Sequence, residues 1–380
     1  MVRFLIMSPA SVNVHIYLAF FLLSTTVLFS TAARGAQPVI YDTDMAIDDW
    51  SALIFLAKHP AVDLRAVTIS ASGETHCKEG IQNVLSLLDL GGAPETVAVS
   101  CGDEYPLDGY FVFPLPWQEQ ADTLSGVAVP KSKRRPRGEH AVETIHRVLA
   151  AAKEPVTLIP VGPLTNIAQW LERYPEDRAK VGRVVIMGGA FDTKGNIIVP
   201  GFTGDHPNTS AEWNIFIDPL AADKVLRSGL NIELVGLDVT NHVRVTSDYV
   251  EAFSARVNNP AADFFNRVFI ENREFIASNE YYFWDVLATL ITVKPDLCGP
   301  EVTPVTVSYV PTDKPAHLKT SDLSMPKTRW DGKSRQHLDA GRSGITRRAK
   351  TGPPIKVCMR TDRNTALQLF TDIVTAPASP

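Results

Sequence analysis

The chain has 380 residues, of which 45% are hydrophobic and 21% are charged, and its formal net charge at pH 7 is −5. This length fits one large α/β domain or two small ones, and the apolar content is enough to bury a sizeable core. The slightly acidic balance gives no general electrostatic case for binding nucleic acid or anionic membranes.

An apolar segment lies near the start of the chain. Residues 16–29 are mostly apolar, a weakly positive stretch precedes them and small residues follow them. This order predicts a secretory signal peptide over residues 1–33, cleaved near Ala33 or Ala36. The apolar run is shorter than the ~20 residues that a membrane-spanning helix needs, so we expect cleavage rather than a retained anchor. The mature protein is therefore expected to be secreted (extracellular or periplasmic), without stable membrane insertion.

The stretch 39–50 carries the strongest local pattern in the chain. A short apolar run predicts a buried strand, and four carboxylates follow within eight residues, at Asp42, Asp44, Asp48 and Asp49. An amphipathic helical run comes next, so the acids lie at a strand's carboxyl end, where open α/β sheets bind ligands. A favourable charge at the helix N-terminus explains two of the acids at most. Because four like charges repel one another without a cation, we predict a site for calcium or magnesium.

Strands and helices then alternate along the chain. Strands are predicted at 62–70, 97–99, 155–161, 184–187 and 232–235. Helices are predicted near 81–88, 140–152, 220–226, 247–277 and from 283. This alternation predicts an α/β, Rossmann-like fold with a mostly parallel central sheet flanked by helices. No repeat or linker divides it, so we expect a single large domain over residues 37–375.

Long polar stretches interrupt this alternation. Residues 101–137 and 191–210 are expected to form long active-site loops, because long loops in a compact domain are commonly functional. Residues 312–355 are expected to form loops or a weak hairpin. An edge strand is predicted at 355–358 and a last helix at 366–374.

The four cysteines are Cys77, Cys101, Cys298 and Cys358. No pair has the C-x-x-C spacing of a zinc site. One or two disulfides are compatible with a secreted chain, buried free thiols are an equal alternative, and the connectivity does not follow from the sequence.

Several motifs together resemble one enzyme family. Asp42-Thr43-Asp44-x-x-Ile47-Asp48-Asp49 resembles the N-terminal signature of the calcium-dependent nucleoside hydrolases. The likeness continues in order through 161–166, 187–190 and 211–219 to Asp285. Any one of these motifs is weak, but their order and spacing over roughly residues 38–300 are specific. The domain over 37–375 thus resembles a nucleoside hydrolase.

The resemblance implies a role for individual residues. Calcium (Ca²⁺) would be bound by the carboxylates of Asp44, Asp49 and Asp285 and by the main-chain carbonyl of Val161. Asp44 is also implied as the general base. The resemblance also implies that the substrate is contacted by Asp48, Glu74, Trp117, Met187, Asn196, Glu212, Asn214 and Trp284. Glu74 stands where the family usually has Asn or Asp.

The implied reaction is hydrolysis of the N-glycosidic bond of a ribonucleoside to free base and ribose. It passes through an oxocarbenium-like state at the anomeric carbon. A calcium-bound water, deprotonated by Asp44, would attack that carbon. The expected partner is a small-molecule ribonucleoside. Family members are commonly homodimers or homotetramers, which is an implication of the resemblance alone.

The residue implied to assist departure of the base differs from that in much of the family. Many members have His immediately before the late calcium-binding Asp, and this chain has Trp284. It resembles the purine-preferring inosine–adenosine–guanosine branch, in which a second Trp helps to sandwich the base. Trp117 is the matching candidate, and stacked indoles would stabilise a protonated purine. The alternatives are that Trp284 is a core aromatic and that Trp117 is an exposed loop residue.

Other departures leave choices open. Met45-Ala46 replaces the usual pair between the acids, and His206 and Asn208 are rivals of Asn196 for the ribose. His76 and His140 are candidate acids, although a lone His is more often structural.

Two rival functions remain from the residues alone. A haloacid-dehalogenase-type phosphatase also begins with a strand and Asp-x-Asp, with Asp42 as nucleophile, but it leaves Glu212 and Asn214 without a role. A calcium-dependent nucleoside or ribose binding protein without turnover would retain the same acids.

Overall fold

The computed structural model describes residues 35–107, 113–200, 203–204, 206–309 and 341–377. The predicted signal peptide, residues 1–33, lies outside these residues. By its internal contacts the chain from Ala36 to Pro380 makes one compact unit, and the fold below is that of its described part.

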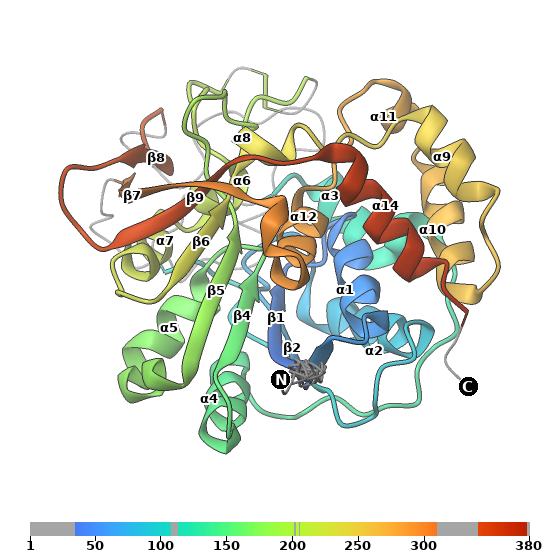
Figure 1. Cartoon of the computed structure of the whole chain (residues 1–380), viewed down its shortest axis with the longest axis horizontal. Helices are drawn as coiled ribbons and strands as arrows, with labels where there is room; N and C mark the ends of the chain where they lie inside the picture. Colours follow the sequence, from blue (N-terminus) through green and yellow to red (C-terminus); the bar gives the residue numbers. More distant parts are fainter. Residues whose placement is uncertain (1–34, 108–112, 201–202, 205, 310–340, 378–380) are drawn as a thin grey trace, which may run out of the picture. The chain divides into compact units, whose positions relative to one another are not determined.

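The described strands form one large mixed sheet (Figure 1). Their bounds are β1 (Gln37–Thr43), β2 (Val62–Ile69), β3 (Ala98–Cys101), β4 (Val156–Pro160), β5 (Val181–Met187), β6 (Ile232–Val235), β7 (Gly299–Ser308), β8 (Ile345–Arg348) and β9 (Pro354–Arg360). Their order in the sheet is β3-β2-β1-β4-β5-β6-β9-β7-β8. β1 to β6 and β9 pair in parallel, and β7 and β8 add antiparallel pairs at one end. The predicted fold class, an α/β protein with a mostly parallel sheet, is confirmed.

Helices cover both faces of this sheet (Figure 1). One face packs against α1 (Asp49–Lys58), α2 (Cys77–Leu90), α10 (Pro260–Glu271), α12 (Trp284–Val293) and α14 (Arg363–Val374). The other packs against α4 (Ala141–Ala151), α5 (Thr165–Arg173) and α7 (Pro219–Leu226). The shorter helices are α3 (Leu115–Thr123), α6 (Trp213–Ile217), α8 (Leu237–Thr240), α9 (Ser247–Ser254), α11 (Arg273–Ala277), η1 (Leu124–Gly126), η2 (Pro175–Lys180) and η3 (Pro295–Leu297).

The two-sided cover explains why β1 reads as a continuous apolar run. Side chains alternate between the faces of a strand, so Val39 and Tyr41 enter one core and Ile40 enters the other. Both faces are therefore closed to solvent. A ligand can therefore bind at the edge where the parallel strands end, and the acids of the 39–50 stretch lie at that edge.

The C-terminal region differs from the sequence expectation. The strand predicted at the edge of the sheet, 355–358, is part of β9, which lies between β6 and β7 in the interior. The 312–355 stretch, expected as loops or a weak hairpin, contributes β8, while residues 310–340 lie outside the described residues. β7 was not predicted, because its Pro and Thr residues and its partly exposed side chains hide the apolar pattern. Two further strands therefore cover the side of β9 that was expected to be open.

The cysteine alternatives are resolved in favour of two disulfides. Cys77 at the start of α2 is bonded to Cys101 at the end of β3, and Cys298 before β7 is bonded to Cys358 in β9. No cysteine of the chain is left free.

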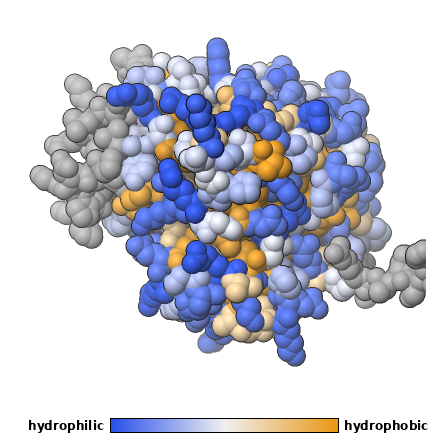
Figure 2. Space-filling view, turned by 60° about the vertical axis from the view of Figure 1, so that its left-hand side comes forward, coloured by the Kyte–Doolittle hydropathy of each residue, from blue (hydrophilic) through white to orange (hydrophobic). Residues whose placement is uncertain are grey.

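The surface of the described part is largely hydrophilic, with apolar patches between the polar side chains in the view of Figure 2. Its exposed large apolar side chains are Ile198, Ile270, Phe275 and Val302. No helix among the described residues is long and apolar enough to span a bilayer.

Candidate active site

Buried carboxylates gather at the carboxyl edge of the sheet. Asp42 and Asp44 lie at the end of β1, Asp48 precedes α1, Asp49 begins it, and Asp285 lies in the first turn of α12; each is less than 5% exposed. Oxygens of Asp48, Asp49 and Asp285 lie within 4.8 Å of one another. The main-chain N of Asp285 donates to Asp48 Oδ2 at 2.7 Å, across a sequence separation of 237 residues. The fold thus brings the late acid onto the early motif.

The turn between β1 and α1 depends on an unusual backbone conformation. Met45 has a φ of 61°, in the left-handed region that residues other than glycine seldom adopt. Its N donates to Thr43 Oγ1 at 3.0 Å, and its carbonyl accepts from Trp50 Nε1 at 2.7 Å. These two bonds hold the turn that folds Asp48 and Asp49 back beside β1.

Asp44 is enclosed between two loops. Glu74 N donates to Asp44 Oδ2 at 3.2 Å, and Thr75 N donates to the Asp44 carbonyl at 3.0 Å. A Cβ added at Gly73 would lie 2.3 Å from Asp44 Cβ, and one at Gly162 would lie 2.9 Å from it. Both loops therefore need glycine where they pass this carboxylate.

Asp42 points to a different part of the structure. Its Oδ1 accepts from Thr68 Oγ1 and, at 2.8 Å, from Asn166 Nδ2. Burial raises the pKa of Asp42 to about 7, against these two bonds. Asp42 therefore ties β1 to β2 and α5 and lies behind the acid cluster.

The next strands bring amide and carbonyl groups to the same edge. The carbonyl of Val161, just after β4, accepts from Asn214 Nδ2 at 2.7 Å. Met187, at the end of β5, places its carbonyl and Sδ each 3.5 Å from the same amide. Glu212 caps α6 by accepting from the main-chain N–H groups of Asn214 and Ile215, and it also accepts from Gly189 N after β5. Three of the predicted substrate-binding residues, Met187, Glu212 and Asn214, therefore share one hydrogen-bonded network with the carbonyl of Val161, a predicted calcium ligand.

The acids repel one another strongly in this setting. Burial raises the pKa values of five carboxylates, those of Asp44, Asp48, Asp49, Asp285 and Glu74. The pKa of Asp48 is raised to about 8. Neighbouring carboxylates raise most of these pKa values further. A cation placed among them would remove both penalties, because it favours the ionised forms.

One oxygen in the cluster has nothing to bond to within the described residues. Asp49 is fully buried, its Oδ1 accepts from Thr43 Oγ1, and its Oδ2 has no hydrogen-bond partner. A buried, unpaired carboxylate oxygen is costly unless it meets a cation. Together with the carbonyl of Val161 the donor set consists of oxygens alone, which suits a hard cation such as calcium. The residues present therefore fit the predicted metal, although the tightest acid group contains Asp48 and not the predicted Asp44.

The candidates for the third ribose contact occupy different places. Asn196 Oδ1 accepts from Trp213 N at 2.9 Å, which places it beside α6. Asn208 is buried, donates to the Ser343 carbonyl at 2.7 Å and accepts from Ala211 N at 2.9 Å, so its amide organises the loop. Burial lowers the pKa of His206 to about 3, which keeps that imidazole neutral.

The two tryptophans chosen from the sequence belong to separate aromatic groups. Trp284, next to Asp285, has its ring 6.1 Å from that of Tyr281 and 5.4 Å from that of Tyr282. Trp117 lies on α3, inside the excursion expected to be a loop, and its ring is 5.7 Å from that of Trp213.

Sequence reasoning missed Trp213 and Phe113 as neighbours of the site. Their rings stack at 5.0 Å, and Trp213 stands between Glu212 and Asn214. Its position inside the quoted motif was the signal that could have found it. Phe113 carried no such signal, because a loop residue's tertiary partner is not visible in periodicity.

The two histidines proposed as acids are each paired with an aspartate. His76 Nδ1 lies 2.7 Å from Asp122 Oδ2, and that hydrogen bond raises the pKa of His76. His140 Nε2 lies 3.2 Å from Asp103 Oδ1.

Comparisons with known proteins agree with this geometry. The family described as inosine-uridine preferring nucleoside hydrolase matches residues 39–368. A pyrimidine-specific ribonucleoside hydrolase RihA of Photobacterium profundum is 36% identical over 228 residues, which are 60% of this chain and 68% of that protein.

Solved structures share the fold over most of the chain. The inosine-uridine preferring nucleoside hydrolase from Bacillus anthracis has a TM-score of 0.71 at 23% identity, over 89% of this chain and 99% of the other. A purine-preferring ribonucleoside hydrolase from Gardnerella vaginalis has a TM-score of 0.68 at 24% identity, over 89% and 98%. The family match spans every described strand except the first residues of β1, and it includes the acids gathered at the sheet edge. The chain therefore belongs to the inosine-uridine preferring nucleoside hydrolase family, whose reaction is hydrolysis of the N-glycosidic bond of ribonucleosides.

Proposed function

We propose that this protein is a secreted, calcium-dependent nucleoside N-ribohydrolase that prefers purine ribonucleosides. The observation that carries the metal part is the unpaired, fully buried Oδ2 of Asp49 within a cluster of carboxylates. The apolar N-terminal segment supports secretion, and so do the two disulfides, which persist in oxidising compartments. Family membership leaves the phosphatase alternative without support, because the match includes Glu212 and Asn214, for which a phosphatase has no use.

In this proposal Asp44 takes the proton of the attacking water. Its carboxylate is held by the Glu74 N–H and enclosed by Gly73 and Gly162, so its orientation is restricted. A general base positioned in this way contributes roughly 10²- to 10⁴-fold to the rate. A calcium ion at the cluster would supply Lewis-acid polarisation of oxygens and hold Asp44 ionised.

In this proposal the ribose is held by groups that follow two strand ends and by groups at one helix N-terminus. Asp48 follows β1, Glu74 follows β2, and Glu212 and Asn214 are fixed together at the N-terminus of α6. Hydroxyl groups of a sugar bind well to such carboxylates and amides. Fixing the sugar keeps its anomeric carbon in line with the water, which lowers the entropic part of the barrier.

The preference for purines rests on Trp284. Trp284 immediately precedes Asp285, one of the buried acids, at the position where much of the family has a histidine. An aromatic face stabilises a cation, so stacking there would favour protonation of a purine ring as it departs.

A pyrimidine preference is the second candidate. It is favoured by relatives that are pyrimidine-specific ribonucleoside hydrolases, among them the 36% identical Photobacterium profundum protein. The aromatic groups around Trp284 and Trp213 could stack on either kind of base, so substrate measurements decide between them.

The deciding experiment measures ribose release from inosine, adenosine, guanosine, uridine and cytidine, with and without a calcium chelator. Release that is strongest on purines and suppressed by the chelator is the expected result. Release mainly from uridine or cytidine would retain the reaction and establish the second candidate. No release from any nucleoside, with calcium still tightly bound, would instead favour a binding protein without turnover.

Removing the proposed base gives a direct test of its role. Asp44→Ala should reduce kcat by about 10³-fold or more while the protein stays folded, because general-base catalysis is lost. Circular dichroism checks the fold. Asp296→Ala, at an exposed acid of η3, is the control and should leave kcat unchanged. Retained activity in Asp44→Ala would overturn the assignment.

A further inference from the structure

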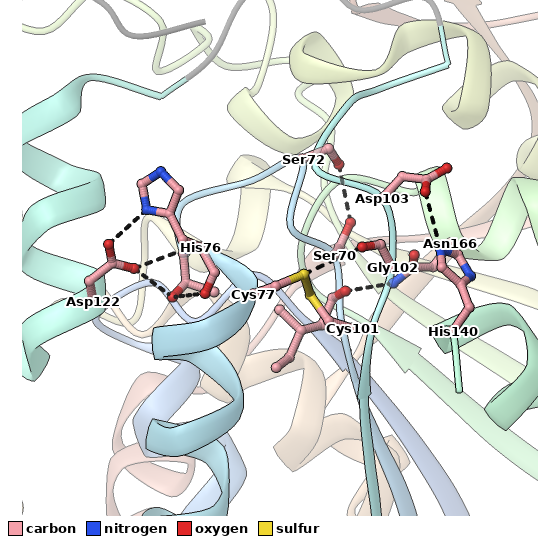
Figure 3. The surroundings of a disulfide bond; sticks show 12 residues. Ser70, Ser72, His76, Cys77, Cys101, Gly102, Asp103, Asp122, His140 and Asn166 are labelled. Carbon is pink, nitrogen blue, oxygen red and sulfur yellow. Dashed lines mark hydrogen bonds and ion pairs between the residues drawn. A yellow bond between two sulfur atoms is a disulfide. The ribbon is translucent and has the colours of Figure 1, made fainter. Parts of the chain in front are cut away.

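One carboxylate from a neighbouring helix holds the loop that follows β2. Asp122 lies in the last turn of α3. Its Oδ1 accepts from Thr75 Oγ1 at 3.0 Å and from the main-chain N of His76 at 2.9 Å, and its Oδ2 lies 2.7 Å from His76 Nδ1. Figure 3 shows the Asp122 carboxylate facing His76 just before the first turn of α2. The carboxylate of Asp122 on α3 therefore holds the loop that connects β2 to α2 at the point where the loop enters α2.

The same loop contacts Asp44. Thr75 donates its main-chain N–H to the Asp44 carbonyl at 3.0 Å, while its hydroxyl donates to Asp122. The preceding residue, Glu74, donates its N–H to Asp44 Oδ2 at 3.2 Å. A single residue thus stands between Asp122 and the backbone of Asp44, and Thr75 itself is only 2% exposed. Movement of Thr75 would be transmitted directly to Asp44.

The helix that carries Asp122 is itself anchored. Gln120 Nε2 on α3 donates to Asn272 Oδ1, just after α10, at 2.7 Å. Asn83 Nδ2 on α2 donates to the carbonyl of Asp122 at 2.9 Å. The Cys77–Cys101 disulfide ties the other end of the loop to β3. Asp122 is therefore a fixed point from which the loop can be positioned.

We propose that Asp122 is a positioning residue, which orients Asp44 for catalysis through Thr75 and His76. The inference rests on the proposed function, in which Asp44 is the general base. Asp122 itself contacts neither water nor substrate in this scheme. Its effect arises because a misplacement of about 1 Å at a reacting group can cost roughly 10²-fold in rate.

The test compares kcat and KM of calcium-loaded, full-length variants on the best substrate. Asp122→Ala removes all three bonds and should reduce kcat by about tenfold to a hundredfold, with a smaller change in KM. Asp122→Asn should be intermediate, because an amide oxygen can still accept from Thr75 and from the N–H of His76.

A matched control lies on the other side of the disulfide. Asp103 also pairs with a histidine, His140 at 3.2 Å (Figure 3). It also accepts from Gln169 Nε2 at 2.6 Å. Within the described part of the chain, its hydrogen bonds to His140 and Gln169 do not involve the loop that touches Asp44. Asp103→Ala should therefore leave kcat unchanged, even if it lowers the melting temperature by as much as Asp122→Ala does.

A milder variant keeps the test decisive if Asp122→Ala fails to fold. Thr75→Val removes one bond and keeps the size of a side chain that packs against Gly80. It should lower kcat severalfold. Wild-type kcat in these variants, with only a lower melting temperature, would show that Asp122 is merely structural. Absence of ribose release by the wild-type protein would overturn the proposed function and this inference together, whereas an active wild type with unaffected variants overturns this inference alone.

Discussion

At the scale of single residues, space around Asp44 is as important as its charge. Gly73 and Gly162 touch its side chain from two sides, so neither position has room for a Cβ. The sequence identified Asp44 from its motif, but it did not reveal that Gly73 is part of the same arrangement. That relation joins residues in the loops that follow two different strands, β1 and β2, and it has no local signature.

We therefore expect Gly73→Ala to displace Asp44. The added Cβ would lie 2.3 Å from both Asp44 Cβ and Oδ2, so kcat should fall at least tenfold and stability by about 1–3 kcal/mol. Gly138→Ala is the control, because a Cβ there meets nothing within 4 Å. Steady-state kinetics and thermal melts measure both effects. Unchanged kinetics in Gly73→Ala would mean that the loop yields without moving Asp44.

Trp284 gives the second prediction at this scale. Trp284→Ala should lower kcat/KM for inosine more than for a nitrophenyl riboside, whose leaving group needs no protonation. Trp284→Phe keeps an aromatic face and should retain part of the difference. Equal losses on both substrates would show that Trp284 only packs against Tyr281 and Tyr282.

At the scale of elements, parallel strands and their helices were predictable and the C-terminal end was not. Apolar runs of four to eight residues between helical patterns indicate buried parallel strands, and β1, β2, β4, β5 and β6 were found in this way. β7 and β8 combine Pro, Thr and Arg residues with partial exposure, so their pattern is that of a loop. Their pairing with β9 is a tertiary property.

The two disulfides should contribute differently to stability because they close different lengths of chain. The separations are 24 residues for Cys77–Cys101 and 60 for Cys298–Cys358. Loop-closure entropy then favours the folded state by about 3.5 and about 4.3 kcal/mol respectively. Urea unfolding of the two double Cys→Ala variants should show a larger loss in the free energy of unfolding when Cys298–Cys358 is removed than when Cys77–Cys101 is removed.

Removal of the two disulfides should also affect catalytic activity differently. Cys77 begins the helix that follows the Glu74 loop, so removing the first disulfide should also reduce kcat. The second disulfide joins β9 to the residue before β7 and should leave kcat unchanged. The reverse pattern would contradict the loop's role in positioning Asp44.

At the scale of the whole molecule, the buried acids tie stability to metal and pH. Their folded pKa values are raised, to about 8 for Asp48 and about 7 for Asp42, above the unfolded values near 4. A raised carboxyl pKa means that the folded state holds protons more tightly. The associated stability is complete below the unfolded pKa and is lost as the pH rises through the folded pKa.

The metal-free protein should therefore melt at a higher temperature at pH 6.5 than at pH 8. Each group that titrates in this window adds at most about 1.4 kcal/mol per pH unit. Calcium should raise the melting temperature most at pH 8, because it binds the ionised forms. Calorimetry with chelator and with calcium measures both. A melting temperature that does not change with pH in chelator would contradict the raised pKa values of these buried acids.

The sequence by itself determined the fold class and the acid motif at the end of β1, because these depend on local order along the chain. The substrate-contact residues stay a prediction from the motif resemblance. Only the tertiary structure decided which carboxylate oxygens meet, which cysteines pair, that β9 lies inside the sheet and that Trp213 stacks on Phe113. The physical reason is the same in each case. Hydrophobic period and motif spacing report how a segment is buried, whereas a partner that is distant in the chain is selected by packing across the folded molecule.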